Sequence, residues 1–120
     1  MLIKQEEIDK LDKQGEMEDL EYKPIAMKFF LPTTNWRWYV LEAKKEKDDV
    51  IFFGLVEGNY REYGYFSLSE LENLTTSMGI VVERDIYFDN KYVNQDNEIV
   101  HMISCSPGPG VFLRDGEALF

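Results

Sequence analysis

The chain contains few of the residues that build disulfides, metal centres and nucleophilic active sites. Cys105 is its one cysteine and His101 its one histidine. One cysteine excludes an internal disulfide, which suits a reducing compartment, and zinc sites of four cysteine or histidine ligands are excluded within one chain. The two residues share one extended segment without an orienting third group, so we expect no catalytic pair. We expect no metal and no cofactor, and we interpret His101 as a half-buried structural residue.

Basic residues and long apolar runs are also scarce. Lys and Arg number 13 against 23 Asp and Glu, which gives a net charge of −10 and a pI near 4.5. This balance disfavours direct binding to nucleic acid and to anionic membranes, because both need clustered basic residues. No apolar run approaches the ~20 residues of a membrane span. The charged N-terminal segment does not resemble a secretory signal. We therefore expect a cytoplasmic protein. Its charge fits either simple solubility or a protein partner with a basic surface.

The fold that the pattern indicates is α+β, in one domain. We divide the domain into an N-terminal helix and acidic loop (1–23), a core (24–88) and a C-terminal extension (89–120). We predict a curved antiparallel β-sheet of about five to six strands, with one packed helix after the central hairpin and a short N-terminal helix. Further strands are predicted at 25–31, 36–43, 80–88 and 99–103, with an edge at 111–113.

The stretch 50–74 is the clearest part of the prediction. Residues 50–57 are apolar on both faces of a strand, which indicates a central strand covered on both sides. A turn at 58–59 leads into a second strand, and Ser67 with Glu70 forms a capping box that predicts a helix from residue 68. Glycine inside a strand marks the close approach of a neighbour. For Gly54 and Gly64 we expect that neighbour to be Trp36 or Trp38.

The N-terminal helix is predicted over residues 3–14. Its apolar stripe is thin, consisting of Ile8 and Leu11. A stripe of this width buries little area, so we expect this helix to dock weakly on the body of the protein.

Aromatic residues form the first candidate site. Such residues dominate the energetics of protein interfaces, and they can also stack on single-stranded bases. The acidic balance argues against bases, and the same rings could instead fill the core of a small sheet. The predicted binding residues are Trp36, Trp38, Tyr39, Tyr63 and Tyr65, together with Glu70 and Glu72.

Carboxylates form the second candidate site. Glu83 and Asp85 would lie on one face of a strand, about 7 Å apart by the strand repeat. Glu57 and Glu62 flank the hairpin loop. If these carboxylates converged, they could hold Mg²⁺ for phosphoryl transfer.

A structural interpretation explains the same carboxylates. Arg84 points away from Glu83 and Asp85 in the predicted strand, and it could pair with Glu70 or Glu72. A nuclease would also need a basic track for its substrate, and the composition offers none.

Five phrases in a fixed order carry a resemblance to a known family: KFFLP at 28–32, NWRWYV at 35–40, IFFGLV at 51–56, GYFSLSELE at 64–72 and ERDIYF at 83–88. Over residues 25–88 the chain resembles the domain of unknown function 2958. These are short bacterial proteins encoded largely on plasmids, conjugative elements and phages. The residues after Asp89 look unlike the family. The resemblance implies a cellular context and supplies no catalytic residue.

Two functions follow as hypotheses. The first is a non-catalytic, small acidic binding protein of a mobile genetic element or phage. It would inhibit a host defence nuclease by occupying a basic surface that otherwise binds nucleic acid. The alternative is a metal-dependent nuclease or hydrolase that uses the clustered carboxylates. A point within ~5 Å of three carboxyl groups would favour the enzyme, and a dispersed acidic face would favour the binding protein.

Overall fold

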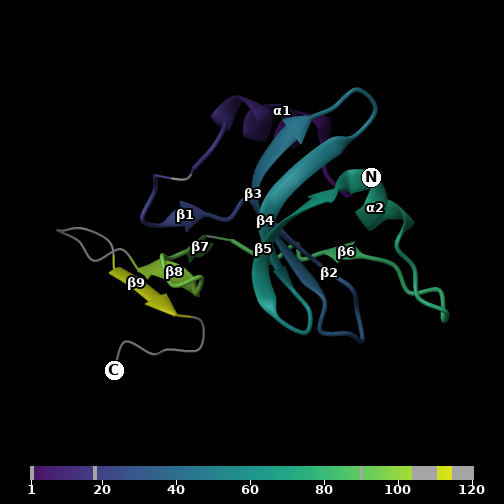
Figure 1. The fold of residues 1–120 in the computed structure, drawn as a ribbon. Helices are drawn as coiled ribbons and strands as arrows, with labels where there is room; N and C mark the ends of the chain where they lie inside the picture. Colours follow the sequence, from purple (N-terminus) through teal and green to yellow (C-terminus); the bar gives the residue numbers. More distant parts are fainter. Residues whose placement is uncertain (1, 18, 90, 104–110, 115–120) are drawn as a thin grey trace.

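Two antiparallel sheets and two helices make up the computed structural model, which describes residues 2–17, 19–89, 91–103 and 111–114. The order in the five-stranded sheet is β5-β4-β3-β2-β6 and in the four-stranded sheet β1-β7-β8-β9 (Figure 1). The elements are α1 (Gln5–Gln14), β1 (Lys23–Pro24), β2 (Met27–Phe30), β3 (Arg37–Lys45), β4 (Val50–Glu57), β5 (Arg61–Ser67), α2 (Leu68–Asn73), β6 (Glu83–Arg84), β7 (Lys91–Val93), β8 (Ile99–Ile103) and β9 (Val111–Arg114).

The predicted α+β class, the antiparallel pairing and the two helices are confirmed. The strands are divided between two sheets rather than joined in one. The chain after residue 89 forms hairpins that pair with the two-residue strand β1. β8 and β9 correspond to the strands predicted at 99–103 and 111–113. β1 and β7 were not predicted, and a lysine followed by a proline is not typical of a strand, so the pairing that makes these segments a separate sheet was missed. Cys105 lies outside the described residues.

The central hairpin and helix α2 follow their local signals. β4 pairs with β3 on one side and β5 on the other, as expected for a strand with two apolar faces. The Ser67 hydroxyl caps α2 by accepting a hydrogen bond from the Glu70 N–H at 3.1 Å. This bond satisfies one of the free N–H groups at the helix start.

Position 54 must be a glycine, because the bulge in β3 leaves no room there for a Cβ atom. The register between β3 and β4 shifts between Val40 and Glu42. A Cβ atom at Gly54 would lie 1.8 Å from the carbonyl oxygen of Tyr39. The close neighbour is therefore backbone, and the prediction of a tryptophan there is wrong. The Trp36 ring lies instead against Gly58, 2.5 Å from where a Cβ would be.

Helix α1 is an integral part of the main core, contrary to the weak docking predicted. Ile8 is 2% exposed and Leu11 5% exposed, and both pack with Phe29, Phe52 and other residues on one face of the larger sheet. Ile3, just before the helix, adds a third buried side chain. The apolar stripe was thus wider than the helical pattern alone indicated.

The second sheet covers part of the opposite face. Leu41 and Leu55 point from the larger sheet into a second cluster, where they meet Val93 and Ile99 of the smaller sheet. Residues nearer the β3–β4 turn on this face, such as Phe53, are only half buried. This uncovered end of the sheet positions the candidate site described below.

The strand predicted at 80–88 is reduced to β6, which pairs with Phe29 and Phe30. Asp85 ends it: its carboxylate accepts a hydrogen bond from the Tyr87 N–H at 3.0 Å, and its carbonyl accepts one from the Phe88 N–H at 3.2 Å. These bonds form a turn that ends the strand, although the Asp85 N–H still donates to the Lys28 carbonyl of β2 at 3.0 Å.

Candidate functional site

The aromatic residues predicted as one binding surface lie in three environments. Trp38 and Tyr39, 7% and 5% exposed, are buried on opposite faces of β3. Trp36 is partly exposed and stacks on Trp38 with ring centroids 6.1 Å apart. Tyr63 is half buried, and burial raises the pKa of its phenol. Tyr65 is 77% exposed, which leaves it as the most accessible ring of the set.

The two acidic residues predicted beside those rings lie exposed on α2. The Glu72 carboxylate accepts a hydrogen bond from the Leu2 N–H at 3.3 Å. Glu70 and Trp38 line a hollow of about 360 Å³, to which the buried Trp38 ring contributes little surface. Arg84 pairs with neither glutamate but with Glu7 of α1, which corrects the predicted structural network.

The carboxylates predicted as a metal site are dispersed. Glu57 pairs with Arg61 at 2.6 Å, and Asp85 with Lys28 at 3.8 Å. The Glu62 and Glu83 side chains are exposed on the two outer strands of the sheet. Within the described ranges, no three histidine, cysteine, aspartate or glutamate side chains are grouped so that they could hold a metal ion.

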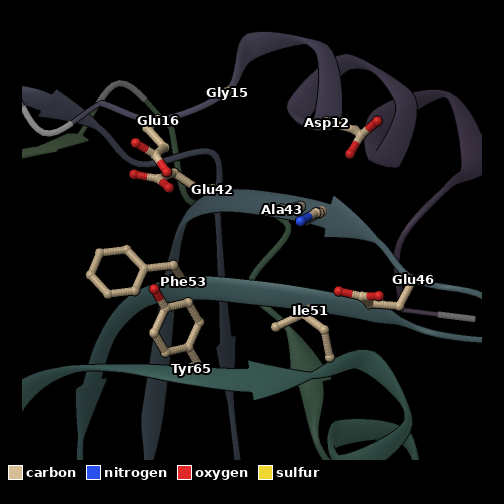
Figure 2. A pocket seen from close by; sticks show the side chains of 10 residues that line it. Asp12, Gly15, Glu16, Glu42, Ala43, Glu46, Ile51, Phe53 and Tyr65 are labelled. Carbon is tan, nitrogen blue, oxygen red and sulfur yellow. The ribbon is translucent and has the colours of Figure 1, made fainter.

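A groove of about 510 Å³ lies on the uncovered end of the larger sheet. Its apolar floor consists of Ile51 and Phe53 of β4 and Tyr65 of β5 (Figure 2). Its other side is formed by the end of α1 and the segment that follows it, including Glu16. The groove is wide enough to accept side chains of a partner.

The floor is a row of side chains set by the strand register. Glu42, Phe53 and Tyr65 occupy directly paired positions on β3, β4 and β5, so their side chains share one face of the sheet. The Phe53 and Tyr65 ring centroids are 5.0 Å apart with planes tilted by 54°. On its other side Phe53 stacks on Tyr63, at 5.5 Å and 8°. The rings hold one another in place, and the Tyr65 ring, 77% exposed, is the one open to a partner.

Four carboxylates and one lysine surround this floor, namely Asp12, Glu16, Glu42, Glu46 and Lys44. The carboxylates of Glu16 and Glu42 lie on the α1 side of the groove (Figure 2). The Glu42 carboxylate accepts a hydrogen bond from the Met17 N–H at 3.1 Å. This bond fixes the Glu42 side chain at the edge of the groove.

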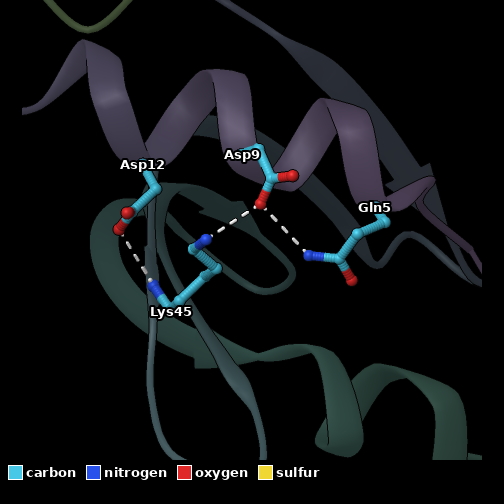
Figure 3. Close-up of polar contacts among 4 residues, drawn as sticks. All are labelled: Gln5, Asp9, Asp12 and Lys45. Atoms are coloured by element: carbon cyan, nitrogen blue, oxygen red, sulfur yellow. Dashed lines mark hydrogen bonds and ion pairs between the residues drawn. The ribbon is translucent and has the colours of Figure 1, made fainter.

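The neighbouring Lys45 does not neutralise this charge, because Asp9 binds its ammonium group. The two side chains are 2.9 Å apart, and Asp9 also accepts a hydrogen bond from Gln5 (Figure 3). The pairing lowers the pKa of Asp9 and raises that of Lys45. The Lys45 backbone N–H donates to Asp12 at 3.1 Å. These contacts fasten α1 to β3, and Asp12 among them also lines the groove.

The sequence did not single out the groove carboxylates or Phe53. One signal was present: Glu42 is the one charged residue in the run 38–43. The bulge that turns Glu42 to the same face as Phe53 could not be predicted from the pattern.

Carboxylates beside open aromatic faces favour cations. None of the helices in the described part of the chain is long and apolar enough to cross a membrane. Fold and groove together define an α+β protein with an acidic groove on an aromatic floor.

Residues 2–95 match the family described as "Protein of unknown function (DUF2958)", and the chain belongs to this family. The match extends beyond the 25–88 segment on both sides and includes α1, β1 and β7. No curated protein and no solved structure is significantly similar to the chain.

Proposed function

We propose that this protein is a non-catalytic binding protein that occupies a basic surface of a protein partner. The observation that carries the proposal is the groove, where four carboxylates face one lysine over an aromatic floor. Aromatic side chains provide contact area at interfaces, and carboxylates select a basic partner. The net charge of −10 would favour encounter with a positively charged surface from a distance.

The partner's basic surface is one that otherwise binds nucleic acid, so the carboxylates take the place of phosphates. The plasmid and phage setting implied by the family resemblance suggests a host defence nuclease as the partner. Inhibition then follows from occupancy and requires no chemistry. A metal-dependent nuclease is the less supported function, because Glu83, Asp85, Glu57 and Glu62 do not meet in the described structure.

The test is affinity capture from a bacterial host lysate with three proteins. They are the wild type, the groove variant Glu16→Gln/Glu46→Gln and the control variant Glu6→Gln/Glu83→Gln. Both variants remove two negative charges at exposed positions, so they have the same net charge and differ in location. Beads are washed at about 0.05 M and about 0.5 M salt, across which the screening length falls severalfold.

We expect the wild type and the control variant to capture the same basic partner at low salt. The high-salt wash should remove this partner, and the groove variant should capture less of it. Adding duplex DNA should displace that partner, because both compete for one surface. Failure to capture a basic protein, or a partner indifferent to salt and DNA, would contradict the proposal. Mg²⁺-dependent cleavage of nucleic acid by the wild type, lost in Glu83→Gln/Asp85→Asn, would establish the enzyme instead.

A further inference from the structure

The outer edge of β5 adjoins the groove and pairs with no other strand in the described structure. β5 is an edge strand of the larger sheet and is seven residues long. Within the described residues it pairs with β4 alone. The other edge of that sheet is β6, with two residues. Edge strands present alternate N–H and C=O groups that can pair with another chain. β5 contains no proline, and its middle residues Tyr63, Gly64 and Tyr65 carry no charge.

A strand added to this edge would extend the row Glu42, Phe53 and Tyr65 by one position. The residue opposite Tyr65 would point its side chain along the floor of the groove. With strands ~4.8 Å apart, β4 lies ~10 Å and β3 ~14 Å from the added strand. An extended arginine on the added strand would reach inward over the Tyr65 and Phe53 rings, toward the carboxylate of Glu42 that the Met17 N–H holds on their far side.

Arginine suits the row better than any other side chain. Its planar guanidinium stacks on aromatic faces and donates paired hydrogen bonds to a carboxylate. Tyr65 and Phe53 offer the faces, and Glu42 and Glu16 the carboxylates. Lysine carries the same charge without the planar group, and it is more strongly hydrated.

We propose that a partner binds by adding an extended segment to the β5 edge, with an arginine opposite Tyr65 lying in the groove. This inference rests on the proposed function, because it names the chemistry by which a basic partner is held. The occupant is a different protein rather than a second copy of this chain. Two copies with a charge of −10 each repel one another, and in such a dimer the acidic groove would meet another acidic surface.

The test uses synthetic seven-residue peptides that alternate threonine and arginine, with blocked ends. Matched peptides carry lysine or neutral citrulline in place of arginine. Two more carry N-methyl groups on one or the other alternating set of residues, which removes the N–H donors along one edge. Binding is measured by calorimetry with the wild type, Tyr65→Ala, Tyr65→Phe and Glu42→Gln. Tyr87→Ala is the control, since Tyr87 is 90% exposed outside the groove.

The arginine peptide should bind the wild type, Tyr65→Phe and Tyr87→Ala alike. It should bind Tyr65→Ala and Glu42→Gln about 10-fold more weakly, the range of a lost stacking or charged contact. Citrulline and one of the two N-methylated peptides should lose about 10-fold or more, and lysine less. Equal binding of all peptides, equal loss with Tyr87→Ala, or no binding at millimolar concentration would overturn the inference.

The captured partner separates this inference from the proposed function. A partner held by Tyr65→Ala as strongly as by the wild type would overturn the strand addition and leave the binding function standing. A wild type that captures no partner would refute the function, and the peptides would still decide what the β5 edge accepts.

Discussion

Arg84 and Glu7 join two segments that lie far apart in the chain. The guanidinium donates hydrogen bonds to both carboxylate oxygens, at 2.7 Å and 2.6 Å. Arg84 is the last residue of β6, and Glu7 lies in the first turn of α1. Each side chain is 28% exposed, so the pair is only partly screened by solvent. The hydrogen bonds from Arg84 lower the pKa of Glu7 from 4.5 to about 2.

This shift makes stability depend on pH in a defined direction. The folded pKa lies below the unfolded value, so the contribution is complete above pH 4.5 and is lost as the pH falls toward 2. Glu7→Gln should lower the free energy of unfolding by about 1–2 kcal/mol near neutral pH. Urea titrations of both proteins between neutrality and about pH 3 should show that difference shrinking. Glu6→Gln, at an exposed neighbouring position, is the control, and a difference independent of pH would contradict the assignment.

Gly54 and Gly64 offer a matched pair, because they face each other in the β4–β5 register. A Cβ atom at Gly54 would collide with the Tyr39 carbonyl at 1.8 Å, whereas at Gly64 the nearest atom is a Val56 methyl at 3.8 Å. We predict that Gly54→Ala costs about 3 kcal/mol or prevents folding. Gly64→Ala should change stability by less than about 1 kcal/mol. Equal losses in thermal or urea unfolding would show that the bulge is not the cause.

Among the elements, α1 differs most from its prediction, because it contributes more to the hydrophobic core than its thin apolar stripe indicated. Leu11 is 5% exposed, in the same cluster as Phe29 and Phe52. Leu11→Ala should lower the free energy of unfolding by about 2–4 kcal/mol, the usual cost of emptying such a site. Lys10→Ala, on the exposed side of the same helix, should be nearly neutral. If urea unfolding shows both variants within about 0.5 kcal/mol of the wild type, α1 docks as weakly as its pattern suggested.

Elements with local signals were predictable, and those that depend on distant pairing were not. The hairpin and α2 could be predicted because their signals lie in consecutive residues. These signals are the apolar faces of β4, the turn after it and the Ser67 cap. β1 exists because β7 pairs with it, almost 70 residues away. The turn at Asp85 ended a strand that alternation alone would have continued. The pattern of neighbouring residues does not indicate which distant segment a strand will pair with.

The groove is less predictable than the fold for the same reason. Its residues come from α1, the segment after it, and three strands. The exposure of Tyr65 depends on where the second sheet stops, and the position of Glu42 depends on the bulge. The sequence singled out Tyr65 with other aromatic residues, and Tyr65 lines the groove. It gave no reason to set it apart from Trp38 and Tyr39, which are buried.

At the scale of the whole molecule, charge acts in two ways that can be measured separately. The total of −10 creates a field that extends over about a Debye length, and it depends little on where each charge sits. The groove carboxylates act at contact, where position decides. Total charge should therefore govern how fast a basic partner arrives. The groove should govern how long the partner stays.

The groove and control variants described above test this division, because each removes two negative charges. With the captured partner immobilised, we predict that both variants lower the association rate by similar factors and that raising salt from about 0.05 M to about 0.5 M removes the difference from wild type. Only Glu16→Gln/Glu46→Gln should raise the dissociation rate, because its lost charges face the bound partner. A dissociation rate raised equally by Glu6→Gln/Glu83→Gln would place the contact elsewhere on the acidic surface.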